Sequence, residues 1–233
     1  MKILGLESSA KAASVAICDE TGLLGQYYQN SGLTHSRTLL PMVEALLKNL
    51  GLSIADMDLI AVAHGPGSFT GVRIGVSAVK GLAWAAEKPV CGVSTLEAMA
   101  YNGLTAPEGS IICCAMDARR QQFYNGLFEI KAGIPQRLCP DRAIGGEELA
   151  LELKKLKKTI FVVGDGAKLC YNVLEKFQLD AILAPEPLLF QTAFGVCQAA
   201  KRAPTQSVHE LLPLYLRLSQ AERERQERVL KQS

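Results

Sequence analysis

The sequence predicts an α/β protein of two related lobes, because short apolar strands alternate with helical segments and the whole pattern occurs twice. In the first half, a strand ends in Glu7, a second strand returns after a short turn, and a later strand runs into the glycine loop of LIAVAHGPG. The second half repeats this order with a strand that ends in Asp117 and with IFVVGDGAK. We therefore expect mixed sheets flanked by helices, with the two lobes facing a cleft. A chance match between common strand–turn–strand units is the alternative.

The first half predicts one complete lobe. Strands are expected at the apolar residues 2–7, 12–18, 23–28, 59–63 and 89–93. Helices are expected at residues 36–50, 72–87 and 95–101. Large aliphatic side chains between Leu39 and Leu50 recur at helical spacing along the first helix, which predicts a buried stripe. Gly51 is expected to end that helix as a C-cap.

The second half predicts the other lobe. The turn formers of NGLTAPEGS place the boundary so that the lobes comprise residues 1–102 and 103–233. Strands are expected at residues 110–117, 121–130 and 159–163, and helices at residues 147–156, 167–177 and 188–202. The tail SQAERERQERVLKQS predicts a charged C-terminal helix, because Ser219 and Glu222 have capping-box spacing. Whether this helix packs back on the first lobe is left open.

Composition narrows the function classes. Hydrophobic residues make up 48% of the 233 residues and charged residues 21%, which favours a folded core. A formal charge of +2 is small for a protein that binds nucleic acid alone, so we expect any such role to depend on a partner. Seven cysteines without CxxC spacing predict buried thiols. Neither a signal peptide nor a membrane span is recognised, and a cytoplasmic protein is expected.

The segment GPGSFTGVRIG leads from a predicted strand into a helix and is the main candidate site. Backbone N–H groups at such a turn can bind an anion, and an arginine in the first helical turn adds a bidentate contact. The candidate nucleotide- or anion-binding residues are Gly65, Gly67, Ser68, Thr70, Gly71 and Arg73, with Asp117 and Arg119 from the other lobe. The segment lacks the Walker A lysine and the third glycine of the dinucleotide motif. Close packing of helix against sheet explains the glycines equally well.

The acidic and histidine residues predict no catalytic centre in this chain. The histidines are His35, His64 and His209, and no two have the spacing of a helical metal-binding pair. We therefore predict no metal ligands and no catalytic residues. Glu7 is interpreted as a hydrogen-bonded turn acid rather than a magnesium-positioning residue.

Several segments together resemble bacterial TsaB (YeaZ-type) proteins of the Gcp-like branch. GPGSFTGVRIG resembles their glycine loop, and the similarity extends to LGLESSAKAASVAI, HSRTLLPMVEALL, GVSTLEAMA and PLYLR. The resemblance implies a two-lobed actin-like ATPase fold, which is ribonuclease H-like. Glu7-Ser8 departs from the more frequent Asp-Thr of the family, which weakens any expectation of phosphate or magnesium binding there.

The resemblance also implies a function. TsaB-like proteins act with the catalytic paralogue TsaD and the ATPase TsaE, which together place threonylcarbamoyl on adenosine beside the tRNA anticodon. We therefore expect a non-catalytic partner subunit that contacts tRNA only through the complex. No cofactor is assigned to the subunit itself, nucleotide binding by it is left open, and the complex needs ATP and magnesium. Without TsaD, the chain is expected to pair with itself. The expected partner interface comprises Leu39, Val43, Leu46, Val76, Val79 and Lys80.

Two other functions are alternatives to a partner subunit. A stand-alone small actin-like ATPase or sugar kinase would hydrolyse ATP or transfer phosphate as the isolated chain; the altered first hairpin and the short length count against it. A metallopeptidase is disfavoured by the histidine spacing.

Overall fold

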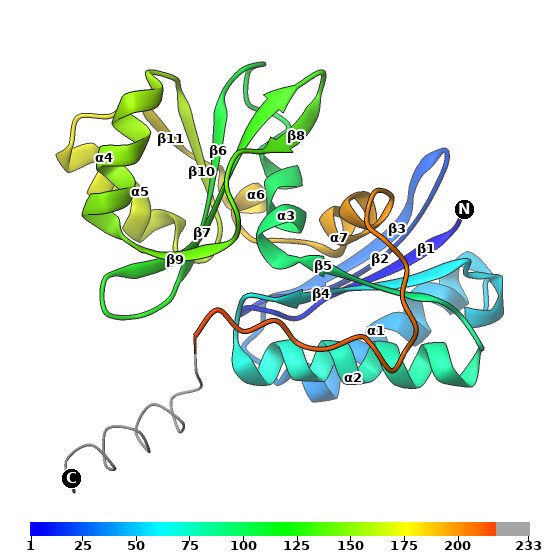
Figure 1. Ribbon diagram of the computed structural model, residues 1–233. Helices are drawn as coiled ribbons and strands as arrows, with labels where there is room; N and C mark the ends of the chain where they lie inside the picture. Colours follow the sequence, from blue (N-terminus) through cyan, green and yellow to red (C-terminus); the bar gives the residue numbers. More distant parts are fainter. Residues whose placement is uncertain (218–233) are drawn as a thin grey trace, which may run out of the picture.

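Two β-sheets form the centres of two lobes in the computed structural model, which describes residues 1–217 (Figure 1). Within these residues, the first sheet is built from β1 Ile3–Glu7, β2 Ala13–Asp19, β3 Gly22–Gln29, β4 Leu59–Gly65 and β5 Val90–Ser94. The second sheet is built from β6 Ile111–Asp117, β7 Gln122–Lys131, β8 Ile134–Arg137, β10 Ile160–Val163 and β11 Ala181–Leu183. A further strand, β9 Arg142–Gly145, pairs with β7.

The two sheets have the same connectivity. The strand order is β3-β2-β1-β4-β5 in the first and β8-β7-β6-β10-β11 in the second. In each, the first strand pairs antiparallel with the second and parallel with the fourth: β1 with β2 and β4, and β6 with β7 and β10. The internal repeat of the sequence is therefore a repeat of topology. The predicted class, an α/β fold of two lobes with mixed sheets flanked by helices, is confirmed.

Helices cover both faces of the first sheet. α1 His35–Leu50 and α2 Phe69–Ala85 lie on one face, and α7 Ala193–Ala200 lies on the other (Figure 1). α3 Thr95–Ala100 packs against both α7 and β6, so it joins the two lobes. The second lobe carries α4 Gly146–Leu156 and α5 Ala167–Lys176, and α6 Glu186–Leu189 precedes the return of the chain to the first sheet. Short 3₁₀ turns lie at Ile54–Asp56 and Tyr101–Gly103.

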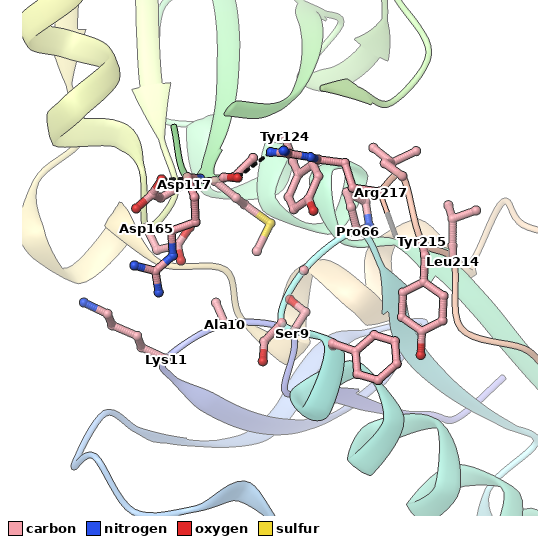
Figure 2. A pocket seen from close by; sticks show the side chains of 17 residues that line it. Ser9, Ala10, Lys11, Pro66, Asp117, Tyr124, Asp165, Leu214, Tyr215 and Arg217 are labelled. Atoms are coloured by element: carbon pink, nitrogen blue, oxygen red, sulfur yellow. Dashed lines mark hydrogen bonds between the residues drawn. The ribbon is translucent and has the colours of Figure 1, made fainter. Parts of the chain in front are cut away.

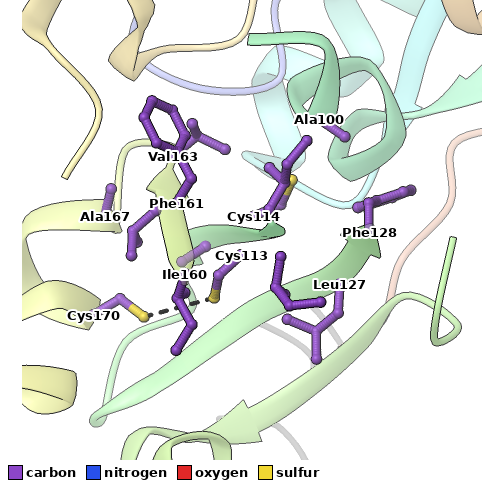
Figure 3. Packing of buried hydrophobic residues seen from close by; sticks show 14 of the residues in the cluster. Ala100, Cys113, Cys114, Leu127, Phe128, Ile160, Phe161, Val163, Ala167 and Cys170 are labelled. Carbon is purple, nitrogen blue, oxygen red and sulfur yellow. Dashed lines mark hydrogen bonds between the residues drawn. The ribbon is translucent and has the colours of Figure 1, made fainter. Parts of the chain in front are cut away.

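Each lobe has an apolar core. In the second lobe, the core lies between the sheet and helices α3, α4 and α5, and Figure 3 shows part of it. There the sulfur atoms of Cys113 and Cys170 are 4.0 Å apart. All seven cysteines are free thiols, and all but the half-buried Cys139 are buried. Burial raises the pKa of Cys114 well above its ordinary value, which makes the thiol unreactive. The prediction of buried thiols is confirmed for these six residues.

The structure moves several predicted boundaries. α2 begins at Phe69 rather than at residue 72, because the Ser68 hydroxyl accepts a hydrogen bond from the N–H of Gly71 and caps the helix. The helix predicted at residues 188–202 is interrupted, since α6 ends at Leu189 and α7 begins at Ala193. Strands β8, β9 and β11 were not predicted; each is at most four residues long. Gly51 caps α1 with a φ of 64°, as predicted.

Residues 204–217 return along the first lobe and end beside the second (Figure 1). The predicted C-terminal helix from Ser219 lies outside the described residues, and the division into lobes at residues 102 and 103 stays a prediction. Among the helices of residues 1–217, none combines the length and the apolar character of a membrane-spanning segment.

Candidate functional site

The glycine loop is where the hairpin of β1 and β2 packs against α2. A side chain at Gly67 would collide with the carbonyl oxygen of Ser9, and one at Gly71 with the carbonyl oxygen of Ser8. Gly65 has a φ of 131°, and a Cβ there would meet the backbone of Leu214. Close approach of backbone to backbone therefore explains these glycines. Of the two interpretations of the loop, the packing one is confirmed.

Three N–H groups in and just after the start of the loop are engaged within the chain. The N–H of Ser68 donates to the carbonyl oxygen of Ser9 at 2.6 Å, and that of Val72 donates to the carbonyl oxygen of Ser68 at 2.9 Å. The Gly71 N–H donates to the Ser68 hydroxyl at 3.3 Å. The Thr70 side chain is exposed. Anion binding at this loop stays a prediction, and it has fewer free donors than the sequence suggests.

An interlobe cleft of about 480 Å³ lies in front of the loop (Figure 2). Its walls are the turn after β1, the glycine loop, the turn after β6, and the chain end at residues 214–217. The cleft brings together four of the predicted site residues: Gly67, Ser68, Asp117 and Arg119. The other four do not line it. Gly65 is covered by Leu214, Gly71 and Thr70 face a neighbouring hollow, and Arg73 faces a groove between α1 and α2.

Glu7 lies behind the cleft and is fully buried. Its Oε1 accepts hydrogen bonds from the Ser9 N–H at 2.6 Å and from the Ser9 hydroxyl at 2.5 Å. Burial raises the pKa of Glu7 to about 7, although these hydrogen bonds lower it in part. The Ser9 hydroxyl also accepts from the buried amide of Gln191, which ties the hairpin to the segment before α7. Glu7 is thus a hydrogen-bonded turn acid, as predicted.

Two aspartates face the cleft from the second lobe. Asp117 ends β6, and its Oδ1 accepts from the backbone N–H of Arg119 at 2.8 Å. Asp165 follows β10; burial raises its pKa to about 6, and the charge of Asp117 also raises it. The Lys11 ammonium partly offsets this effect. The sequence analysis missed Asp165, although the repeat marks its position by the GDGAK loop.

The turn from β6 to β7 has an unusual backbone. Three consecutive residues other than glycine, Arg119, Arg120 and Gln121, have φ values of 66°, 54° and 60°. The left-handed region costs each such residue on the order of 1–2 kcal/mol. The bond from Arg119 to Asp117 and one from the Gly146 N–H to the Gln121 carbonyl oxygen hold the turn. The turn places Arg119 at the edge of the cleft.

Residues 214–217, at the end of the described chain, form the remaining wall of the cleft. We call residues 206–217 the strap, since they cross the first lobe from β5 to the cleft. The Leu214 N–H donates to the carbonyl oxygen of His64 at 2.7 Å, and His64 Nδ1 lies 3.0 Å from the Leu212 carbonyl oxygen. Burial lowers the pKa of His64. Arg217 Nη1 donates to the carbonyl oxygen of Ala118 at 2.7 Å, which ties the strap to the second lobe (Figure 2).

The histidines of the same region contact backbone carbonyl oxygens. His35 Nε2 lies 2.7 Å from the Ala10 carbonyl oxygen, so this histidine joins α1 to the first hairpin. Within residues 1–217, no group of three histidine, cysteine, aspartate or glutamate side chains is arranged to hold a metal ion.

Comparison with known proteins decides the family. A family model described as TsaD, tRNA N6-adenosine threonylcarbamoyltransferase, matches residues 29–185. The tRNA threonylcarbamoyladenosine biosynthesis protein TsaB of Bacillus subtilis is 32% identical over 95% of this chain and 96% of its own length. The TsaB protein of Haemophilus influenzae is 29% identical over 93% of this chain and 94% of its own. The chain belongs to the TsaB family.

A solved structure supports the same grouping. YeaZ from Pseudomonas aeruginosa superimposes with a TM-score of 0.80 at 29% identity, covering 92% of this chain and 99% of that one. The two-lobed architecture that the resemblance to TsaB implies is therefore confirmed over nearly the whole chain.

Most of the residues predicted to contact a TsaD-like partner have buried side chains. Leu39, Val43, Leu46, Val76 and Val79 are buried in the core that joins α1 and α2 to their own sheet. Lys80 is half-buried. The helical spacing of these aliphatic residues reflects packing of α1 and α2 on their own sheet. A partner that binds these helices would therefore contact the face that points away from the sheet. That face presents Leu40, Arg73, Ser77, Gly81 and Trp84.

Proposed function

We propose that this chain is a non-catalytic partner subunit in tRNA threonylcarbamoyladenosine biosynthesis, acting with a TsaD-like transferase. The observation that carries the proposal is the match to the B. subtilis TsaB protein over nearly the full length of both chains. The histidines add support, because His35 and His64 contact backbone carbonyl oxygens and belong to no His–His pair. The subunit contributes a folded surface, and the complex supplies the transfer chemistry.

The partner surface in this proposal is the outer face of α1 and α2. Proteins named tRNA N6-adenosine threonylcarbamoyltransferase match this chain over part of its length; that of Chlamydia caviae is 35% identical over 43% of it. Two related folds can pair through equivalent helices about a pseudo-twofold axis. Trp84, 74% exposed, and Leu40, 47% exposed, give this face the apolar anchors that interfaces favour.

The remaining parts of the proposal follow from the family. A TsaE-like ATPase joins the complex, ATP and magnesium serve the other subunits, and tRNA reaches this chain only through them. In the absence of TsaD, the same helices pair two copies of the chain. A role in tRNA modification places the protein in the cytoplasm.

Reconstitution tests this function. The purified chain is mixed with TsaD, TsaE, the adenylate synthase, tRNA, threonine, bicarbonate and ATP, and the modified nucleoside is measured by mass spectrometry. We expect modification to fall to background when the chain is omitted and to return when it is added. Equal modification without the chain would contradict the proposal.

A stand-alone actin-like ATPase or kinase is the second candidate, because two aspartates and Lys11 face the interlobe cleft. It requires ATP turnover by the isolated chain, and an Asp165→Asn variant must abolish that turnover. A preparation with no hydrolysis above the variant removes this candidate.

A further inference from the structure

Arg73, in the second turn of α2, packs against the aromatic rings of Phe69 and Tyr215. Its guanidinium carbon lies 3.8 Å from the ring centroid of Phe69 and 5.8 Å from that of Tyr215. The two rings are stacked with their centroids 4.8 Å apart. Arg73 Nε donates a hydrogen bond to the Tyr215 hydroxyl at 2.8 Å. One helix residue and one strap residue thus fix the orientation of the guanidinium.

Among residues 1–217, only Nε of the Arg73 guanidinium takes part in a hydrogen bond or ion pair, so both terminal nitrogens have no partner within this part of the chain. Such a planar fork binds a carboxylate through two parallel hydrogen bonds. Because the side chain is already ordered, binding costs less conformational entropy than it would for a free arginine.

The fork faces a groove between α1 and α2, which we call the helix groove. It encloses about 600 Å³ and has Arg73, Phe69, Leu40, Ile74, Ser77 and Ala78 among its lining residues. Ser77 and Ala78 are small enough for another helix to approach closely, while Leu40 and Ile74 supply apolar contact. No carboxylate of residues 1–217 lines the groove. Its occupant must therefore bring the negative charge.

The charges of the two helices favour a different protein over a second copy of this chain as that occupant, so two copies are expected to pair there only when no such partner is present. α1 and α2 carry four cationic side chains, Arg37, Lys48, Arg73 and Lys80, against the single carboxylate of Glu44. A twofold interface places the same surface on both sides and would bring these cations together. Like charges across an interface are unfavourable, so the helix groove fits a different protein with an acidic helix face.

We propose that Arg73 is the polar anchor of the helix groove and binds the carboxylate of an aspartate or glutamate on a helix of the TsaD-like partner. This inference rests on the proposed function and adds the chemistry by which the partner is recognised. Phe69 and Tyr215 are positioning residues, because they hold the guanidinium without touching the partner's carboxylate.

Affinity measurements with the full-length chain and purified TsaD-like protein test the proposal. We expect Arg73→Ala to weaken binding about 10- to 100-fold, because a bidentate charged contact is lost. Arg73→Lys keeps the charge but loses the fork, and about 10-fold weakening is expected. Tyr215→Phe keeps the ring but removes the bond to Nε, and about 2- to 5-fold weakening is expected. Lys176→Ala, which removes one positive charge from the second lobe, is the matched control and is expected to bind like wild type.

Three results separate the outcomes. Wild-type binding with an unchanged affinity of Arg73→Ala overturns the anchor while the proposed function stands. No wild-type binding at all refutes the partner role itself. Loss of self-association in Arg73→Ala by sedimentation, with TsaD affinity intact, assigns the groove to a second copy and also overturns the inference. Each variant is compared with wild type by circular dichroism, and the salt dependence of binding must be weaker in Arg73→Ala than in wild type.

Discussion

Neutralising Glu7 is expected to stabilise the protein at and above about pH 7 and to have no effect below pH 4.5. The side chain is fully buried behind the cleft, and only its Oε1 is hydrogen-bonded among the described residues. Burial raises its pKa to about 7, so the folded protein carries an unfavourable charge once this carboxyl ionises. Glu7→Gln keeps an acceptor for Ser9 and removes the charge.

The magnitude follows from the pKa. The pKa of Glu7 rises from an ordinary value of 4.5 to about 7 on folding, which corresponds to ~3 kcal/mol at about 1.4 kcal/mol per tenfold change in proton affinity. A raised pKa means that the folded state binds the proton more tightly than the unfolded state. The stabilisation is therefore complete below pH 4.5 and is lost as the pH rises through about 7. Glu7→Gln should gain up to ~3 kcal/mol over wild type at high pH.

Urea unfolding at a series of pH values measures this difference. We expect the free energies of unfolding of Glu7→Gln and wild type to converge toward pH 4.5 and to separate steadily up to about pH 7. Glu175→Gln, at an exposed position on α5, is the control and should follow wild type throughout. A constant difference across the range would refute the reasoning, because it would show that the Glu7 carboxyl does not titrate with folding.

Two matched pairs test the packing of the first lobe by thermal or urea unfolding. Gly71→Ala should destabilise by about 3 kcal/mol or more, because the added methyl meets the backbone of Ser8, whereas Gly81→Ala on the same helix meets no atom and should stabilise by up to about 1 kcal/mol. Leu39→Ala should cost about 2–5 kcal/mol, because Leu39 is 1% exposed, whereas Leu40→Ala should change stability by less than about 0.5 kcal/mol. Equal effects within either pair would contradict the packing described here.

The sequence predicted the order and pairing of the main strands, but neither the short edge strands nor the direction of individual side chains. Apolar strands that end in Glu7 and Asp117 predicted the repeat, because both lobes begin with the same antiparallel pair. The short strand β8 was not predicted, because it contains Pro135. A proline is acceptable in a strand only at the edge of a sheet, and the sequence does not show which strands lie at an edge. The direction of Arg73 was also not predictable, because it depends on Tyr215, a partner 142 residues away.

Five of the six predicted interface residues are buried in the chain's own core, for a physical reason that applies to any amphipathic helix. Periodic aliphatic residues mark the face that is buried, and the nearest apolar surface is the chain's own sheet. Leu39 and Val79 satisfy that requirement within the lobe. A partner face must instead be identified from side chains that remain exposed without internal partners, such as Trp84, and sequence periodicity assigns those to solvent.

The glycine loop is the point where the first hairpin, α2 and the strap come into contact. Ser9 of the first hairpin and Leu214 of the strap contact this segment, and Phe69 lies within it. Phe69 lines both the interlobe cleft and the helix groove, and Tyr215 connects it to Arg73. A change in the strap therefore alters the groove and the cleft together. Tyr215→Phe should weaken partner binding without loss of folding stability comparable to Gly71→Ala, because it removes one half-exposed hydrogen bond rather than a backbone contact.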